Sequence, residues 1–394
     1  MSLSIAPIAL EAIPQPKGTG QAAVDAQKAL PFVTAIIPCR NELGYIDKCL
    51  DSLIASDYPL DRMEVLVADG RSEDGTREVV ESYAARYPWI RLLDNPKRIL
   101  ASAWNVGILA ARGEIVVALN AHGEFNRSYI SRCVGHLLSN RTLDCVGGVV
   151  KAIPKDDGLL GRAICLVLSS RFGVGNSHFR TGSAAPRLAD TVAFGGYWRS
   201  LFDKVGLFNE ELTRSQDMEL HRRLEAAGCK ILLDPSMYCH YFTRTRLSEF
   251  LRYSFVNGFW VTYPLRVAAV AIRLRHIVPL LFVLSLLAAG SLALSLPGAA
   301  LPGLSIPLFP ALLFAIVSAY VGANLYSSLR AAASQREPRY ALLLPFLFLT
   351  LHVTYGLGSL WGLSKAVFAR RFWHNLHRML LGAPGESNAL PQGR

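Results

Sequence analysis

The chain has 394 residues, a length that exceeds one ordinary domain and predicts at least two structural units. Hydrophobic residues make up 51% of it and charged residues only 18%, and the formal net charge is +11. Much of the basic excess flanks long apolar segments, as on the cytoplasmic side of membrane spans, which argues against nucleic acid as the partner. The seven cysteines show no metal-like pairing and indicate free thiols in a reducing compartment.

The first part of the chain reads as a leader followed by an α/β domain. Residues 1–30 lack the charge and apolar order of a secretory signal, and we expect a disordered leader. Residues 32–150 alternate apolar, β-rich runs with helical stretches, which predicts a mostly parallel sheet covered on both faces. Ligands of such sheets bind at the carboxyl ends of the strands. The candidate residues just after strand-like runs are Glu42, Asp69, Asn120 and His122.

Past residue 150 the pattern changes. Residues 151–190 read as an irregular loop, which at this length is functional or disordered. A helix is predicted to end at Gly228 and to carry Asp217 in its first turn, where the carboxylate can face a cleft. Residues 249–266 mix aromatic and basic side chains as an interfacial helix does, although an ordinary packing helix fits equally well.

Three apolar segments without Asp, Glu, Lys or Arg follow, at 277–296, 308–329 and 341–363, and each is long enough to cross a bilayer as a helix. If the first two form a hairpin, both of its ends are basic and cytoplasmic. The third either crosses against this charge bias or is re-entrant, which its glycines permit; three crossings is the favoured interpretation. In both cases the domain before residue 265 is cytoplasmic, and residues 365–394 form a basic tail.

Six short motifs occur in a fixed order along the first 265 residues. They are I-I-P-C-R-N-E at 36–42, V-A-D-G-R-S-E-D-G-T at 67–76, W-N-V-G-I-L-A-A-R-G-E at 104–114, N-A-H at 120–122, F-G-G-Y at 194–197 and S-Q-D-M-E-L-H-R-R at 215–223. In this order they resemble the family 2 glycosyltransferases of the GT-A fold, and within them the membrane-attached enzymes of exopolysaccharide assembly such as the succinoglycan glucosyltransferase group. The resemblance implies a GT-A domain over residues 31–265 and a membrane region over 277–364.

The resemblance also implies a binding site for a nucleotide-sugar donor. Its expected members are Glu42, Asp69, Arg98, Asn120, Gly195 and Gly196. Asp69 stands at the position that binds uracil or ribose in similar enzymes, and a carboxylate that only holds a turn is the alternative. For Glu42 the alternative is a carboxylate that serves only a helix dipole.

Asn120 and His122 stand where the family usually has an acidic triplet or, in the exopolysaccharide subgroup, Asp-Ala-His. The last member of that motif binds the Mg2+ or Mn2+ that bridges the donor diphosphate. We therefore expect a divalent cofactor held mainly by substrate phosphates, because hard cations prefer oxygen ligands and Asn120 replaces an acid. The alternative for His122 is a hydrogen-bonded loop residue.

Asp217 is the predicted catalytic base. Inverting transfer needs one carboxylate to take the proton of the acceptor hydroxyl, and the family usually presents Glu-Asp where this chain has Gln216-Asp217. Secondary candidates for contact with the acceptor or a phosphate are Arg180, Gln216, Arg222 and His240. For the charged members of this set, a solvated surface charge fits as well.

These features predict an inverting enzyme that moves a hexose from a UDP-sugar to a lipid-linked saccharide, in exopolysaccharide or cell-surface polysaccharide synthesis. The expected location is the cytoplasmic face of a bacterial inner membrane, with membrane lipids and a polysaccharide assembly complex as candidate partners. Two alternatives stay open: transfer directly to polyprenyl phosphate, and a non-catalytic scaffold, which the loss of acids at Asn120 and Gln216 motivates. The sequence does not fix which sugar is transferred.

Overall fold

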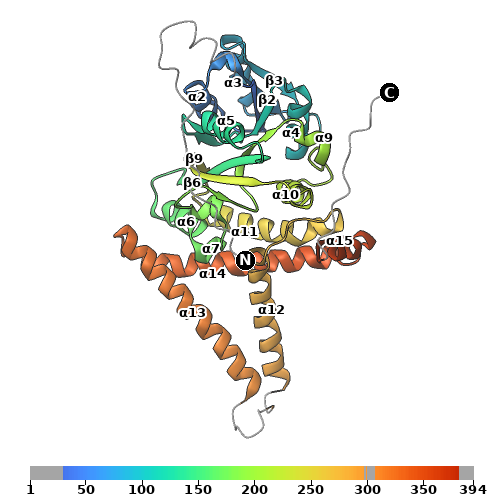
Figure 1. Ribbon diagram of the computed structural model, residues 1–394. Coiled ribbons are helices and arrows are strands. Elements are labelled where there is room, and N and C mark those ends of the chain that lie inside the picture. Colours follow the sequence, from blue (N-terminus) through green and yellow to red (C-terminus); the bar gives the residue numbers. More distant parts are fainter. Residues whose placement is uncertain (1–29, 297–298, 300–306, 381–394) are drawn as a thin grey trace.

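The computed structural model describes residues 30–296, 299 and 307–380. The predicted leader therefore lies almost wholly outside the described residues, as does the tail beyond residue 380. Figure 1 shows a domain built around one sheet, seated on a set of long helices. All seven cysteines are free, as predicted.

The first half of the sheet is parallel. Strands β1 (Val33–Cys39), β2 (Met63–Asp69), β3 (Ile90–Asp94) and β4 (Ile115–Ala118) lie in the order β3-β2-β1-β4. They are connected by helices α2 (Ile46–Ile54), α3 (Thr76–Arg86) and α4 (Leu100–Ala110). Every residue of β1 and β2 is buried, because helices cover both faces of these strands. This half matches the predicted alternation of strands and helices.

The second half of the sheet is mixed. Its strands are β5 (Gly123–Phe125), β6 (Cys145–Pro154), β7 (Arg187–Leu188), β8 (Ala193–Trp198) and β9 (Ile231–Thr243). Strand β8 pairs antiparallel with both β4 and β6, β6 pairs parallel with β9, and β5 and β7 pair antiparallel with β9. Helices α5 (Tyr129–Ser139), α9 (Leu201–Val205) and α10 (Gln216–Ala226) complete the domain. The antiparallel β8 sets Gly196 opposite Val117 of β4, at the end of the parallel half.

The prediction of an irregular loop at 151–190 is wrong for much of this segment. Strand β6 runs to Pro154, and three helices follow: α6 (Leu159–Ser169), α7 (Arg171–Val174) and α8 (His178–Thr181). Helix α6 buries Ala163, Ile164 and Val167 in a cluster with residues of the long C-terminal helices. Its packing partners lie about 180 residues further along the chain, so the local sequence pattern gives little sign of them.

The C-terminal part contains α11 (Leu247–Thr262), the 3-10 turn η2 (Tyr263–Arg266), α12 (Leu274–Ser295), α13 (Leu308–Gln335), α14 (Tyr340–Ala366) and α15 (Arg370–Leu380). Helices α12, α13 and α14 are each long and apolar enough to cross a membrane. They differ in burial: 44% of the apolar window of α14 is buried within the protein, against 17% for α12 and 6% for α13. In Figure 1, α12 and α13 extend away from the sheet domain, whereas α14 lies across their base.

Helix α14 packs against α11, and glycines line the contact. A Cβ added to Gly258 of α11 would meet the backbone carbonyl of Tyr355, and one added to Gly358 or Gly362 of α14 would meet the carbonyls of Phe255 and Phe259. The two backbones therefore approach as closely as only glycine allows. The glycines that suggested a re-entrant segment serve helix packing here, and α11 is at least partly a packing helix.

Candidate active site

A cavity of about 490 Å³ opens where β1, β2 and β4 end and where β8 joins the parallel half. This is the edge at which open α/β sheets bind ligands. The predicted residues that line it are Glu42, Arg98, Asn120, His122, Arg180, Gly195 and Asp217. The other predicted residues, Asp69, Gly196, Gln216, Arg222 and His240, are not among its described lining residues.

His122 is held on both sides of its ring. Its Nδ1 lies 3.0 Å from Glu42 Oε1, and its Nε2 lies 2.7 Å from the Tyr241 hydroxyl. The antiparallel pairing of β5 with β9 sets Gly123 opposite Tyr241 and so brings the two side chains together. Burial raises the pKa of Tyr241 to about 12, so this hydroxyl keeps its proton at neutral pH. We assign Nδ1 as the donor to Glu42 and Nε2 as the acceptor from Tyr241.

This corner does not fit a preformed cation site. The Nε2 lone pair of His122 is occupied by the Tyr241 hydroxyl, and the Asn120 side-chain oxygen accepts the backbone N–H of His122 at 2.8 Å. Across the described residues, no group of three or more His, Cys, Asp or Glu side chains is arranged to hold a metal ion. The predicted metal ligation by His122 and Asn120 therefore stays a prediction, and the hydrogen-bonded loop histidine is the arrangement observed.

Glu42 faces the cavity through this contact with His122. Its backbone N–H donates to Thr76 Oγ1 at 2.8 Å, and its carbonyl accepts from the first turn of α2. The carboxylate thus points toward the site and not only toward the helix terminus.

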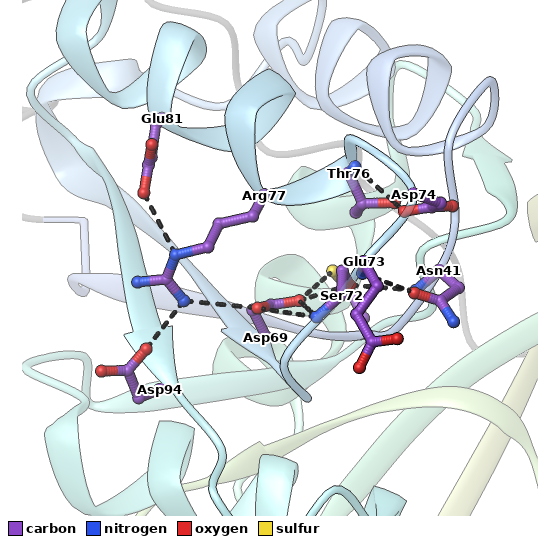
Figure 2. A network of polar contacts seen from close by, with 10 residues as sticks. Asn41, Asp69, Ser72, Glu73, Asp74, Thr76, Arg77, Glu81 and Asp94 are labelled. Carbon is purple, nitrogen blue, oxygen red and sulfur yellow. Dashed lines mark hydrogen bonds and ion pairs between the residues drawn. The ribbon is translucent and has the colours of Figure 1, made fainter.

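Asp69 is fully buried, and its carboxylate is used inside the fold (Figure 2). It accepts the Ser72 backbone N–H at 3.2 Å and the Ser72 hydroxyl at 2.5 Å, and Arg77 lies 3.3 Å away. This is the turn-holding role that the sequence left open. Gly70, the next residue, lines the cavity in its place. A contact from Asp69 to uracil or ribose remains a prediction.

The two glycines of β8 allow close packing around the cavity. A Cβ on Gly195 would lie 2.6 Å from the Tyr197 hydroxyl, and one on Gly196 would meet Cys133 Sγ. Side chains at these positions would push β8 away from its neighbours. A direct role of either glycine in donor binding stays a prediction.

Asp217 lies in the first turn of α10, with its side chain exposed on the cavity wall. Ser215, which precedes the helix, has a φ of 60° and bonds the Trp260 carbonyl through its hydroxyl at 2.7 Å. That bond fixes the start of α10 to α11. Within the described residues, no hydrogen bond or ion pair engages the Asp217 carboxylate, which leaves it available to a ligand.

The neighbours of Asp217 on α10 differ in their surroundings. Gln216 is buried, and its side-chain oxygen has no partner within the described part of the chain, so it does not replace the lost acid in the cavity. His221, one helical turn beyond Asp217, is 4% exposed and also lines the cavity. Its Nε2 has no hydrogen-bond partner among the described groups. Burial lowers the pKa of His221 below 6.5, so the ring is neutral at pH 7.

Arg180 connects the cavity to α11. Its Nη2 donates to the Tyr253 hydroxyl at 3.2 Å. Burial by itself would raise the pKa of Tyr253, but the guanidinium groups of Arg180 and Arg244 outweigh this effect and lower it. A cationic side chain is thereby held beside Asp217 at the boundary between the sheet domain and the long helices.

Two secondary candidates lie away from the cavity. Arg222 is buried and donates to the Arg378 carbonyl at 2.9 Å, which ties α10 to α15. His240 lies in β9 opposite Glu124, beside the ring of Tyr238. Their predicted contacts with acceptor or phosphate are not supported by this geometry.

Sequence reasoning missed Tyr241, His221 and Trp104, which all line the cavity. His221 had a usable signal, since it follows Asp217 by four residues and shares its helix face. Tyr241 had none, because the β5–β9 pairing joins segments more than 110 residues apart.

Comparisons with known proteins agree with this geometry. The family model described as "Glycosyl transferase family 2" matches residues 34–205. The succinoglycan biosynthesis protein ExoA of Rhizobium meliloti is 30% identical over 263 residues, covering 60% of this chain and 75% of its own. A dolichyl N-acetyl-alpha-D-glucosaminyl phosphate glucuronosyltransferase of Methanococcus voltae, which transfers a diacetamido sugar, is 27% identical over 341 residues, covering 85% of this chain and 98% of its own.

Among solved structures, the mannosyltransferase PcManGT from Pyrobaculum calidifontis, in complex with GDP-Man and Mn2+, has a TM-score of 0.51 at 20% identity. The alignment covers 87% of this chain and 89% of that one. This likeness shows the fold and confirms the predicted GT-A class.

Proposed function

Because the chain belongs to the family 2 glycosyltransferases, we propose that it is an inverting enzyme that transfers a hexose from a UDP-sugar to a lipid-linked saccharide. The observation that carries this proposal is Asp217, an exposed carboxylate without a protein partner in the described residues, on the wall of the cavity at the strand ends. A base in that position has the access that proton removal from a bound hydroxyl requires.

In this proposal the acceptor oxygen attacks the anomeric carbon of the donor sugar while Asp217 takes the hydroxyl proton. The bond from that carbon to the diphosphate oxygen breaks, and the nucleoside diphosphate leaves with the electron pair. Attack from the face opposite the leaving group inverts the anomeric configuration. Because the observed corner is not a preformed cation site, the proposed step assigns no chemistry to a metal.

The chain's own cations can receive the leaving diphosphate. Arg40, Arg98 and Arg180 all line the cavity, and guanidinium groups bind phosphate oxygens in pairs. Glu42, held by His122, is placed on the same wall to accept a hydrogen bond from the sugar or ribose. The Mg2+ or Mn2+ predicted from the sequence would take most of its ligands from the donor phosphates.

The membrane part supports a lipid-linked acceptor. Two relatives act, by name, in succinoglycan biosynthesis and on a dolichyl-phosphate-linked sugar, and the second aligns with almost the whole chain. We infer a multi-pass protein of a bacterial inner membrane, with the sheet domain on the cytoplasmic side, where the basic flanks of α12 and α13 also lie.

The test is Asp217→Asn in membranes that contain the full chain, with transfer from radiolabelled UDP-sugars to extracted lipid acceptors as the readout. Loss of the general base should lower kcat by about 10²–10⁴-fold. Asp203→Asn, an exposed carboxylate on α9, is the matched control and should leave kcat unchanged. Retention of activity within a few-fold of wild type by Asp217→Asn would overturn the assignment.

A further inference from the structure

A second cavity of about 180 Å³ lies against the same catalytic residue. Asp217, His221, Phe179 and Arg180 line both this cavity and the larger one at the strand ends. Asp217 therefore stands on the wall between two compartments. A general base in a transfer reaction needs this arrangement, because the donor sugar must lie on one side of it and the attacking hydroxyl on the other.

The long C-terminal helices form part of the wall of the second cavity. Tyr253 and Asn257 come from α11, Arg275 and His276 from the first turn of α12, and Leu351 from α14. The larger cavity, in contrast, is lined mainly by the sheet domain and its loops. A substrate anchored in the bilayer would reach the second cavity first, and a soluble nucleotide-sugar the larger one.

The lining of the second cavity carries two arginines, Arg180 and Arg275, and two carboxylates, Asp190 and Asp217, so the formal charges cancel. Arg275, whose side chain is 7% exposed, lies 2.8 Å from Asp190, and Arg273 lies 3.2 Å from the same carboxylate. Arg180 donates to the Tyr253 hydroxyl at 3.2 Å and also faces the larger cavity, where it can meet the donor diphosphate. A phosphate group in the second cavity would meet no net positive charge and two carboxylates, so the cavity does not suit bare polyprenyl phosphate.

The other lining groups suit a neutral sugar ring. Ser177 offers a hydroxyl, Thr191 Oγ1 lies 3.5 Å from His221 Nδ1, and the Asn257 amide also bonds Tyr253. The buried Nε2 of His221 has no partner among the described residues. Leu168, Val174, Met218 and Leu351 supply apolar surface for a ring face. Polar groups that converge beside apolar patches suit a small ligand with both hydroxyl groups and an apolar ring face.

We propose that this second cavity binds the terminal sugar of the lipid-linked acceptor and that His221 Nε2 and Asn257 orient its hydroxyl toward Asp217. The inference rests on the proposed function and adds the place and the chemical class of the acceptor: an uncharged, hexose-sized ring. His221 and Asn257 are positioning residues, since the proton still passes to Asp217.

The test compares Asn257→Ala and Thr191→Val, on different walls of the cavity, with Ser248→Ala, an exposed change on α11. Each variant is assayed with a short polyprenyl diphosphate that carries one hexose, from a panel of glucose, galactose and N-acetylglucosamine, and with the corresponding polyprenyl phosphate. We expect the acceptor KM of each cavity variant to rise about tenfold, the effect of one lost hydrogen bond. UDP-sugar binding and slow hydrolysis of the donor should stay at wild-type levels, as should every parameter of Ser248→Ala.

Two outcomes would overturn the inference while leaving the proposed function intact. The first is wild-type acceptor KM in both cavity variants while transfer proceeds. The second is that polyprenyl phosphate without a sugar is as efficient an acceptor as the best polyprenyl diphosphate-linked sugar. If wild-type protein neither binds nor hydrolyses any UDP-sugar, the proposed function itself fails, so the two failures are distinguishable. Thr191→Val keeps the test decisive if Asn257→Ala does not fold.

Discussion

Arg223 fastens the helix that carries Asp217 to the segment after α9, and breaking its buried ion pair with Glu219 should be costly. Arg223 and Glu219 lie one turn apart on α10, both nearly inaccessible, with two contacts of 2.8 Å between guanidinium and carboxylate. Arg223 also donates to the carbonyls of Val205, Gly206 and Leu207, at the end of α9 and in the loop that follows. One side chain thus fixes α10 to the neighbouring segment.

Arg223→Met keeps the apolar stem and removes all of these contacts. It leaves the Glu219 carboxylate buried without a counter-charge, which costs about 3–5 kcal/mol of unfolding free energy. For a domain of this size, that loss lowers Tm by roughly 6–20 °C. Because α10 presents Asp217, kcat should fall as well, while the affinity for donor changes less.

The assay is thermal unfolding of the purified full chain in detergent, followed by tryptophan fluorescence, with transfer kinetics measured in parallel. Arg127→Met, an exposed arginine, is the matched control. The double variant Arg223→Met/Glu219→Met should recover part of the loss, with a coupling of about 0.5–3 kcal/mol. A loss of about 1 kcal/mol of unfolding free energy lowers Tm by at least about 2 °C in a domain of this size. A Tm of Arg223→Met within about 2 °C of wild type would therefore show that Arg223 and Glu219 do not stabilise the position of the helix.

Three further predictions concern the metal, pH and topology. Asn120→Asp should tighten Mn2+ binding in the presence of UDP, measured by titration calorimetry; equal affinities in the two proteins would refute a metal at this corner. Burial lowers the pKa of His221, so as the pH falls the unfolded chain binds a proton at this residue before the folded chain does. The folded state is therefore not destabilised by His221 above about pH 6.5, and its free energy of unfolding decreases as the pH drops below that value. His221→Gln should flatten this acid-side loss in unfolding experiments between pH 7 and 5, and an unchanged slope would contradict it. Since α14 is packed across the base of α12 and α13, a fluorescent protein fused after residue 394 should fluoresce on the cytoplasmic side and an alkaline phosphatase fusion should be inactive; the reverse pattern would mean that α14 crosses.

The parallel half of the sheet was predictable because its signal is local. Apolar runs such as the one at β1 alternate with helical stretches, and the polar residues that end those runs must meet at one edge. Glu42, Asn120, His122 and Asp217 accordingly line one cavity. The orientation of a side chain is a different matter: Asp69 sits at the predicted edge, yet Ser72 and Arg77 engage its carboxylate inside the fold.

What the sequence could not predict depends on contacts between distant segments. The Tyr241 hydroxyl bonds the Nε2 of His122 because the β5–β9 register brings the two residues together. The second cavity forms where helices that are distant in the sequence, among them α8, α11 and α12, meet. Helix α14 has the composition of a span, but its burial is decided by α11 and α6. Hydropathy reports how apolar a segment is and not whether lipid or protein covers it.

The glycine-mediated contact between α11 and α14 also determines how the enzyme would meet its substrates. Because the two backbones touch, the sheet domain cannot tilt freely on the long helices, which would hold Asp217 at a constant height above a bilayer that those helices cross. An acceptor dissolved in the bilayer then finds the site by lateral diffusion, whereas the donor arrives from the water. The turnover rate should follow the mole fraction of acceptor in the membrane and not its bulk concentration, so that diluting vesicles leaves it unchanged while diluting the acceptor with inert lipid lowers it.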